Sequence, residues 1–67
     1  MIQYSSSQQA DILVIDDSPD ELRLLSNFLK DQGYHVRQAL DGEMALLAIQ
    51  TMLPDLILLE TSLPRLN

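Results

Sequence analysis

Three acidic residues directly follow apolar segments of this sequence. Asp16 and Asp17 come after the run "ILVI" at 12–15, and Glu60 comes after "LILL" at 56–59. Carboxylates that lie close together repel one another, and a proton or a hard cation held by oxygen ligands relieves this repulsion. Mg²⁺ suits sites of one to three carboxylates completed by water. If the two apolar segments are neighbours in the fold, the three acids meet in one crevice that could hold this cation.

The segments that precede these acids are typical of strands buried on both faces. Residues 11–15 and 55–60 are short and apolar on both faces, as in a parallel sheet. A helix is expected directly after the first strand, because Ser18 and Glu21 fit a capping box and Pro19 occupies the first helical position. Gly33 is expected to end that helix in a left-handed conformation.

A second strand and a second helix are expected between the two apolar segments. Residues 34–39 ("YHVRQA") alternate in polarity and are less apolar, which favours an edge strand. Asp41 can cap a helix that Pro54 stops. The order strand–helix–strand–helix–strand with short loops predicts an α/β fold with parallel strands. The apolar stripes expected to face the core comprise Leu22, Leu25, Phe28 and Leu29 in the first helix and Met44, Ala45, Leu47, Ala48 and Met52 in the second.

Composition excludes several classes of function. The 67 residues contain no cysteine and one histidine, His35, which excludes disulfides, thiolate metal sites and a Ser-His-Asp triad. The formal net charge is −6 and the four basic residues are scattered, which does not suit nucleic-acid binding. No apolar run is long enough to cross a membrane, and no export signal is visible. We therefore expect a soluble, cytoplasmic protein with a flexible arm at 1–10 and a folded domain at 11–67.

The segments "DILVIDDSPDE", "DGEMAL" and "PDLILLETSLP" together resemble the receiver domain of bacterial two-component response regulators. The resemblance implies half of a five-stranded, doubly wound fold, with strand order 2-1-3 for the strands present. Members of this family accept a phosphoryl group from a histidine kinase on an aspartate that ends the third strand. By position, Asp16 and Asp17 match the acid pair that holds Mg²⁺, and the carbonyl of Ser62 matches its backbone ligand. Glu60 matches the phosphoacceptor, and Pro64 matches the proline of the following loop.

Two departures from the family pattern predict inefficient phosphorylation. Glu60 stands where the family has aspartate, and its extra methylene moves the carboxylate by ~1.5 Å. A misplacement of about 1 Å can cost on the order of 100-fold in rate. The printed sequence also ends before the family's last two strands, which carry a hydroxyl and a lysine that contact the phosphoryl group. We therefore expect a truncated, atypical receiver that is not an enzyme, with Mg²⁺ as a possible cofactor.

The third strand predicts association with another chain. In the family's sheet order its far side would pair with a fourth strand, so Leu56, Ile57, Leu58 and Leu59 form an open, apolar edge. Such edges pair readily with other chains. We predict a homodimer in which two third strands run antiparallel side by side. Exchange of the N-terminal arm is the alternative geometry, and a histidine kinase is a further possible partner.

Simpler interpretations of the same residues stay open. Asp16 and Asp17 could be solvated turn residues, and Glu60 could be an inert surface acid. Besides a signalling module that acts through association, the sequence is compatible with an Mg²⁺-dependent phosphoacceptor site completed by a partner. It is also compatible with a structural fragment that folds and pairs.

Overall fold

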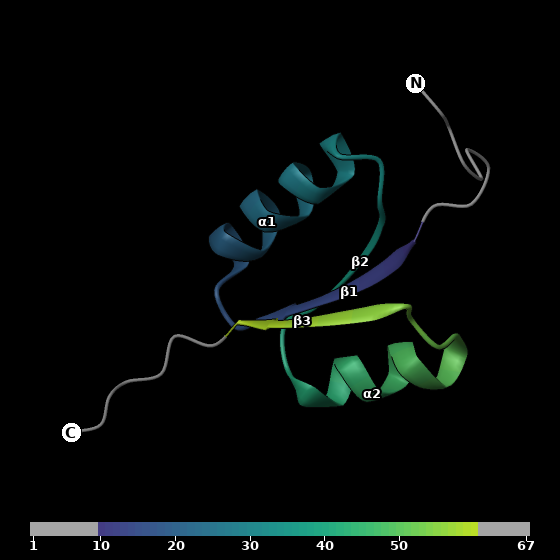
Figure 1. The fold of residues 1–67 in the computed structure, drawn as a ribbon. Coiled ribbons are helices and arrows are strands. Elements are labelled where there is room, and N and C mark those ends of the chain that lie inside the picture. The colour runs from purple at the N-terminus through teal and green to yellow at the C-terminus, as the bar shows by residue number, and fades with distance from the viewer. Residues whose placement is uncertain (1–9, 61–67) are drawn as a thin grey trace.

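The computed structural model describes residues 10–60, which form a three-stranded parallel sheet with one helix on each face (Figure 1). The elements in chain order are β1 (Asp11–Asp16), α1 (Pro19–Asp31), β2 (His35–Ala39), α2 (Gly42–Thr51) and β3 (Leu56–Glu60). The strand order β2-β1-β3 places the first strand in the centre. The predicted α/β class and the order 2-1-3 are therefore confirmed. Ser62, Pro64 and the predicted arm, apart from Ala10, lie outside the described residues.

Local signals in the sequence set the ends of α1. The Ser18 hydroxyl accepts the N–H of Glu21 at 3.4 Å, and Pro19 occupies the first helical position. At the other end Gly33 has a φ of +98°, a left-handed conformation that side chains with a Cβ rarely adopt. The N–H of Gly33 donates to Lys30 and that of Tyr34 to Leu29, which is the Schellman pattern. Because this cap holds Tyr34, β2 begins one residue later than predicted, at His35.

The core is built around β1, whose apolar side chains face both helices. Ile12 and Val14 pack with Leu22 of α1 on one face. Leu13 packs with Ala39 of β2 and Ala45 of α2 on the other face. All six residues are buried, so the predicted double-sided burial of the first strand is confirmed.

Four members of the predicted apolar stripes do not reach this core, namely Phe28, Met44, Leu47 and Met52. Phe28 is 60% exposed and Leu47 is 63% exposed. Leu25 and Leu29 in α1, and Ala48 and Ile49 in α2, make the contacts with the core instead. A sheet of three strands is narrow, so each helix rests on it through a narrower stripe than the sequence pattern predicts. Phe28 and Leu47 therefore lie outside the surface through which their helices pack on the sheet.

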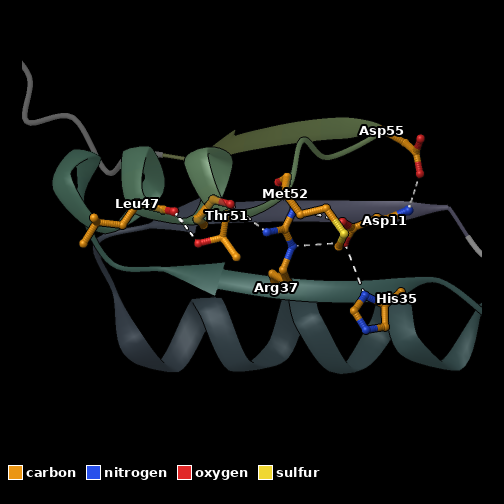
Figure 2. A network of polar contacts seen from close by, with 8 residues as sticks. Asp11, His35, Arg37, Leu47, Thr51, Met52 and Asp55 are labelled. Carbon is orange, nitrogen blue, oxygen red and sulfur yellow. Dashed lines mark hydrogen bonds and ion pairs between the residues drawn. The ribbon is translucent and has the colours of Figure 1, made fainter.

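A polar network ties the elements together at the amino end of β1 (Figure 2). The carboxylate of Asp11 is largely buried, and Nη2 of Arg37 on β2 lies 2.8 Å from its Oδ2. Nδ1 of His35 lies 3.3 Å from Oδ1. The N–H of Asp11 donates to Oδ2 of Asp55 at 2.7 Å, and the N–H of Asp55 donates to the carbonyl of Asp11 at 2.7 Å. The network thus joins β1, β2 and the start of β3.

Arg37 also caps the carboxyl end of α2. Its Nη1 donates to the carbonyl of Ala48 at 2.8 Å and its Nη2 to that of Met52 at 2.7 Å. The last turn of α2 contains no basic residue of its own, although a cation there would stabilise the negative end of the helix dipole. Arg37 supplies this cation from the neighbouring strand.

Replacing Asp11 by asparagine tests this network through its pH dependence. Burial alone would raise the pKa of Asp11, but the hydrogen bonds and charges of Arg37 and His35 outweigh it and hold the pKa below its ordinary value of 3.8. The stabilisation is therefore present above pH 3.8 and is lost as the pH falls through the lowered pKa. We expect Asp11→Asn to reduce the free energy of unfolding at pH 7 by about 1–3 kcal/mol, measured by urea denaturation.

The loss should be smaller at pH 3 than at pH 7, because the Asp11 carboxylate of the parent protein begins to gain a proton as the pH falls toward its lowered pKa. Asp31→Asn is the control, because Asp31 is an exposed acid in the last turn of α1. An equal loss at both pH values would show that packing, and not charge, holds Asp11.

Candidate acidic site at the carboxyl end of the sheet

Parallel pairing brings the predicted acids to one edge of the sheet. β1 pairs with β3 in a register that places Asp16 opposite Glu60. Asp17 follows in the loop that leads to α1, and it is exposed. The condition for a shared site, that the first and third strands are neighbours, is therefore met.

Asp16 is fully buried, with an exposed fraction of 0%. Its Oδ1 accepts the N–H of Ser18 at 2.9 Å, which tightens the turn between β1 and α1. Its Oδ2 is buried and receives no hydrogen bond from any donor among residues 10–60. Burying a carboxylate oxygen without a hydrogen-bond donor costs folding free energy. A proton or a cation bound to this atom would offset that cost.

The capping box predicted at Ser18 and Glu21 is only half formed. Ser18 caps the helix as predicted, through the N–H of Glu21. In a complete box the Glu21 carboxylate would accept the N–H of Ser18, but Asp16 accepts that N–H instead. The side chain of Glu21 therefore does not accept the N–H of Ser18, as a complete capping box would require.

Glu21 instead faces the other acids. The Asp16 carboxylate, acting as a hydrogen-bond acceptor for the protonated form of Glu21, raises the pKa of Glu21 above its ordinary value of 4.5. The charge of Asp16 adds to the effect, followed by a small loss of hydration and by the charges of Glu60 and Asp17. We call Asp16, Asp17, Glu21 and Glu60 the acidic cluster. The sequence alone did not indicate Glu21 as a member, because its spacing to Ser18 already explained it as part of a cap.

The acidic cluster partly satisfies the requirements of a magnesium site. The unpaired Oδ2 of Asp16 and the neighbouring carboxylates are hard oxygen donors, which Mg²⁺ prefers together with several waters. Within residues 10–60, no three acidic or histidine side chains form a complete metal-binding group. The predicted backbone ligand, Ser62, lies outside the described residues. The carboxylates of Asp16 and Asp17 are of the donor type that Mg²⁺ prefers, but the described residues do not assemble a metal site.

A pocket lies where the start of α1, the end of β2 and the start of α2 come together. It is lined by Pro19, Leu22, Arg23, Gln38, Leu40 and Met44. None of the four acids lines it, so this pocket and the acidic cluster are separate features.

Comparison with known proteins identifies the family. The response regulator receiver domain matches residues 12–67. The DNA-binding response regulator MtrA of Mycolicibacterium smegmatis is 39% identical over 56 residues, which cover 84% of this chain and 25% of that protein. The alkaline phosphatase synthesis transcriptional regulatory protein PhoP of Bacillus subtilis is 46% identical over 56 residues, covering 84% of this chain and 23% of that protein. No solved structure shows a significant match.

The chain therefore belongs to the receiver domain family of two-component response regulators. It spans about a quarter of the length of these two relatives. Among residues 10–60, neither helix combines the length and the apolar character that crossing a membrane requires.

Replacing Glu21 by glutamine tests the repulsion inside the acidic cluster. Because the pKa of Glu21 is raised in the folded protein, stability is lost as the pH rises from 4.5 through the raised value. We expect Glu21→Gln to melt at a higher temperature than Asp20→Asn at pH 7 without divalent cations, measured by circular dichroism.

Asp20 is the matched control, because it lies in the same first turn but points to solvent and pairs with Arg23. Both variants lose one favourable charge at the helix start. Asp20→Asn also loses the ion pair with Arg23, which contributes little because both side chains are exposed, so the comparison mainly reports the repulsion from Asp16. Glu21 is exposed, so the difference should be small and should fall with added salt. Equal melting temperatures at low salt would contradict the expectation.

Proposed function

We propose that this chain is a receiver module of two-component signalling that binds a divalent cation at Asp16 and Asp17 but accepts a phosphoryl group poorly. In this proposal it acts in signalling through association and not as an enzyme. The observation that carries the proposal is the β1–β3 register, which places Asp16 beside Glu60 in a chain of the receiver family. A histidine kinase is the proposed source of the phosphoryl group and a candidate partner.

The residues of the acidic cluster have separate roles in this proposal. Asp16 and Asp17 would hold the cation; Ser62, whose carbonyl the family resemblance assigns as a backbone ligand, lies outside the described residues. A bound divalent cation would neutralise charge on the oxygens of an incoming phosphoryl group. Asp16 is positioned for this role by the N–H of Ser18, which fixes one oxygen and leaves Oδ2 available.

Glu60 holds the acceptor position but is poorly placed to react. It ends β3 and is exposed, so its carboxylate is accessible to a phosphodonor. Its side chain is longer than aspartate by one methylene, about 1.5 Å. Phosphoryl transfer relies almost wholly on positioning and charge stabilisation, so this displacement is sufficient to reduce the rate severely.

Replacing Glu60 by aspartate tests this reasoning. We expect Glu60→Asp to react with a small phosphodonor and Mg²⁺ on the order of 100-fold faster than the parent protein. The reaction is followed by intact mass, with the mass of one added phosphoryl group as the signal.

Glu60→Gln is the control for labelling elsewhere on the chain. Stoichiometric labelling of the parent protein at Glu60 would overturn the proposal that it is a poor acceptor. Equal rates for the parent and Glu60→Asp would show that the extra methylene is not what limits the reaction.

The second part of the proposal is that β3 pairs with β3 of a second copy. β3 is an edge strand, bonded on one side to β1 and on the other to no strand among residues 10–60. The two helices make their contacts with β1 and β2, not with β3. Leu56, Ile57 and Leu59 are accordingly 56%, 45% and 62% exposed, and Leu58 is partly buried. An antiparallel pair of β3 strands would satisfy the free backbone groups and shield these side chains.

Light scattering at micromolar concentration tests the association. We expect the parent protein to be a dimer and Ile57→Lys to be a monomer, because related copies of the new charge would lie close together across the interface. Leu24→Lys is the matched control, since Leu24 is an equally apolar, 70% exposed residue on α1. A folded, monomeric parent protein would contradict the proposed dimer.

A further inference from the structure

We propose that the exposed apolar surface shared by α2 and β3 binds a basic amphipathic helix of a partner protein. We call this surface the α2–β3 face. It consists of Glu43 and Leu46 of α2, Leu53 of the link that follows, and Ile57 and Leu59 of β3, all of them exposed. Binding there requires neither a bound cation nor a phosphoryl group.

The side chains of β3 point to known sides of the sheet. Leu58 packs with Ile12 and Val14 on the side that α1 covers, and successive side chains of a strand point to opposite sides. Ile57 and Leu59 therefore point to the side of α2. They stay exposed because α2 rests on β1 and β2 and not on β3. A helix about 10 Å in diameter covers about two strands, which lie ~4.8 Å apart.

The helical periodicity of α2 places Leu46 on the flank that faces β3. The buried Ala45 marks the side of α2 that rests on the sheet. Its two neighbours in the sequence lie about 100° to either side of it. Met44 lies on the side of β2, because it lines a pocket together with Gln38. Leu46 therefore lies on the side of β3, and Glu43, one turn earlier, shares this flank.

The charges around the α2–β3 face favour a cationic partner. Arg37, which reaches α2 from β2, is paired with a buried carboxylate, and its side chain is only 19% exposed. Residues 40–60 contain no lysine, arginine or histidine, and their four acids are Asp41, Glu43, Asp55 and Glu60. An apolar surface bordered by acids complements a helix that has an apolar stripe flanked by lysine or arginine.

A second copy of this chain is the competing occupant. It would bring the same acids to the α2–β3 face, and like charges would oppose the contact. Antiparallel pairing of two β3 strands would shield Ile57 and Leu59 from the side, but it would place no helix over them. The face can therefore bind a helix in a monomer and in an edge-paired dimer.

A synthetic helical peptide tests the proposal. The probe is a fluorescent peptide of about 18 leucine and lysine residues, with its leucines on one face of the helix. We expect micromolar binding to the parent protein, measured by fluorescence anisotropy, and weaker binding as salt is added. A scrambled peptide of the same composition, and a version with glutamate in place of lysine, should each bind at least about tenfold more weakly.

Variants of exposed residues locate the binding site. Leu46→Gln and Leu59→Thr should each weaken binding about tenfold, and Glu43→Gln should weaken it less, because an exposed charge contributes little. Leu24→Gln and Asp31→Asn are the matched controls on α1 and should bind like the parent protein. All five residues are exposed, so each variant should stay folded, which circular dichroism checks.

Three outcomes would overturn the proposal. Equal affinities of Leu46→Gln, Leu59→Thr and Leu24→Gln would show that the peptide does not use the α2–β3 face. Absence of binding at millimolar peptide would show that the face is not available to a partner helix. If light scattering shows that Leu46→Gln dissociates an oligomer of the parent protein, the occupant is a second copy of this chain.

Discussion

The pairing of β1 with a strand on each side is the constraint on which this fold depends. A strand can be buried on both faces only when its backbone groups are bonded along both edges, and β2 and β3 supply these bonds. Ile12, Leu13 and Val14 can then be fully apolar, and each face requires a helix to cover it. Because all three strands are parallel, their carboxyl ends meet at one edge, and the loops that follow β1 and β3 are brought together there.

The two ends of β1 show how the surroundings determine the behaviour of a buried acid. Asp11 and Asp16 lie on the same strand and are both buried. Asp11 is paired with Arg37, and the pairing holds its charge in place. Asp16 is surrounded by other acids, and one of its oxygens receives no donor from the described residues. A buried, unsatisfied acid is a stability cost that well-folded proteins tend to keep only where it has a function.

Local signals predicted most of the fold. Ser18, Pro19 and Gly33 act through their own backbone conformations or immediate neighbours, so the ends of α1 followed from the sequence. The apolar runs indicated the strands β1 and β3, of which only β1 is buried in the described part of the chain. Phe28 was assigned to the core wrongly, because helical periodicity indicates which side is apolar but not how wide a sheet lies beneath it. The acids that end β1 and β3 were predictable as neighbours once parallel pairing was inferred.

The features that the sequence did not predict depend on groups that compete for the same hydrogen bond or on partners that are distant in the sequence. Asp16 and Glu21 can both accept the N–H of Ser18, and only the geometry of the turn decides in favour of Asp16. Arg37 looked like a polar residue on an edge strand, yet it bonds two carbonyls at the end of α2 as well as Asp11. Its partners are separated in the sequence, so no local pattern could have identified them.

The placement of Arg37 also affects the long-range electrostatic interaction of the molecule with a partner. Among residues 10–60, Arg37 and Lys30 lie toward the amino end of the strands together with Asp11, Asp31 and Asp55, whereas the opposite end carries seven acids and one base, Arg23. The acids at that end are Asp16, Asp17, Asp20, Glu21, Asp41, Glu43 and Glu60. The described part of the chain is therefore more negative at the carboxyl end of the strands than at the amino end. In low salt, the excess of acids attracts an approaching cationic surface to this end of the molecule and speeds their encounter. The fold therefore orients a cationic partner as well as positioning its own side chains.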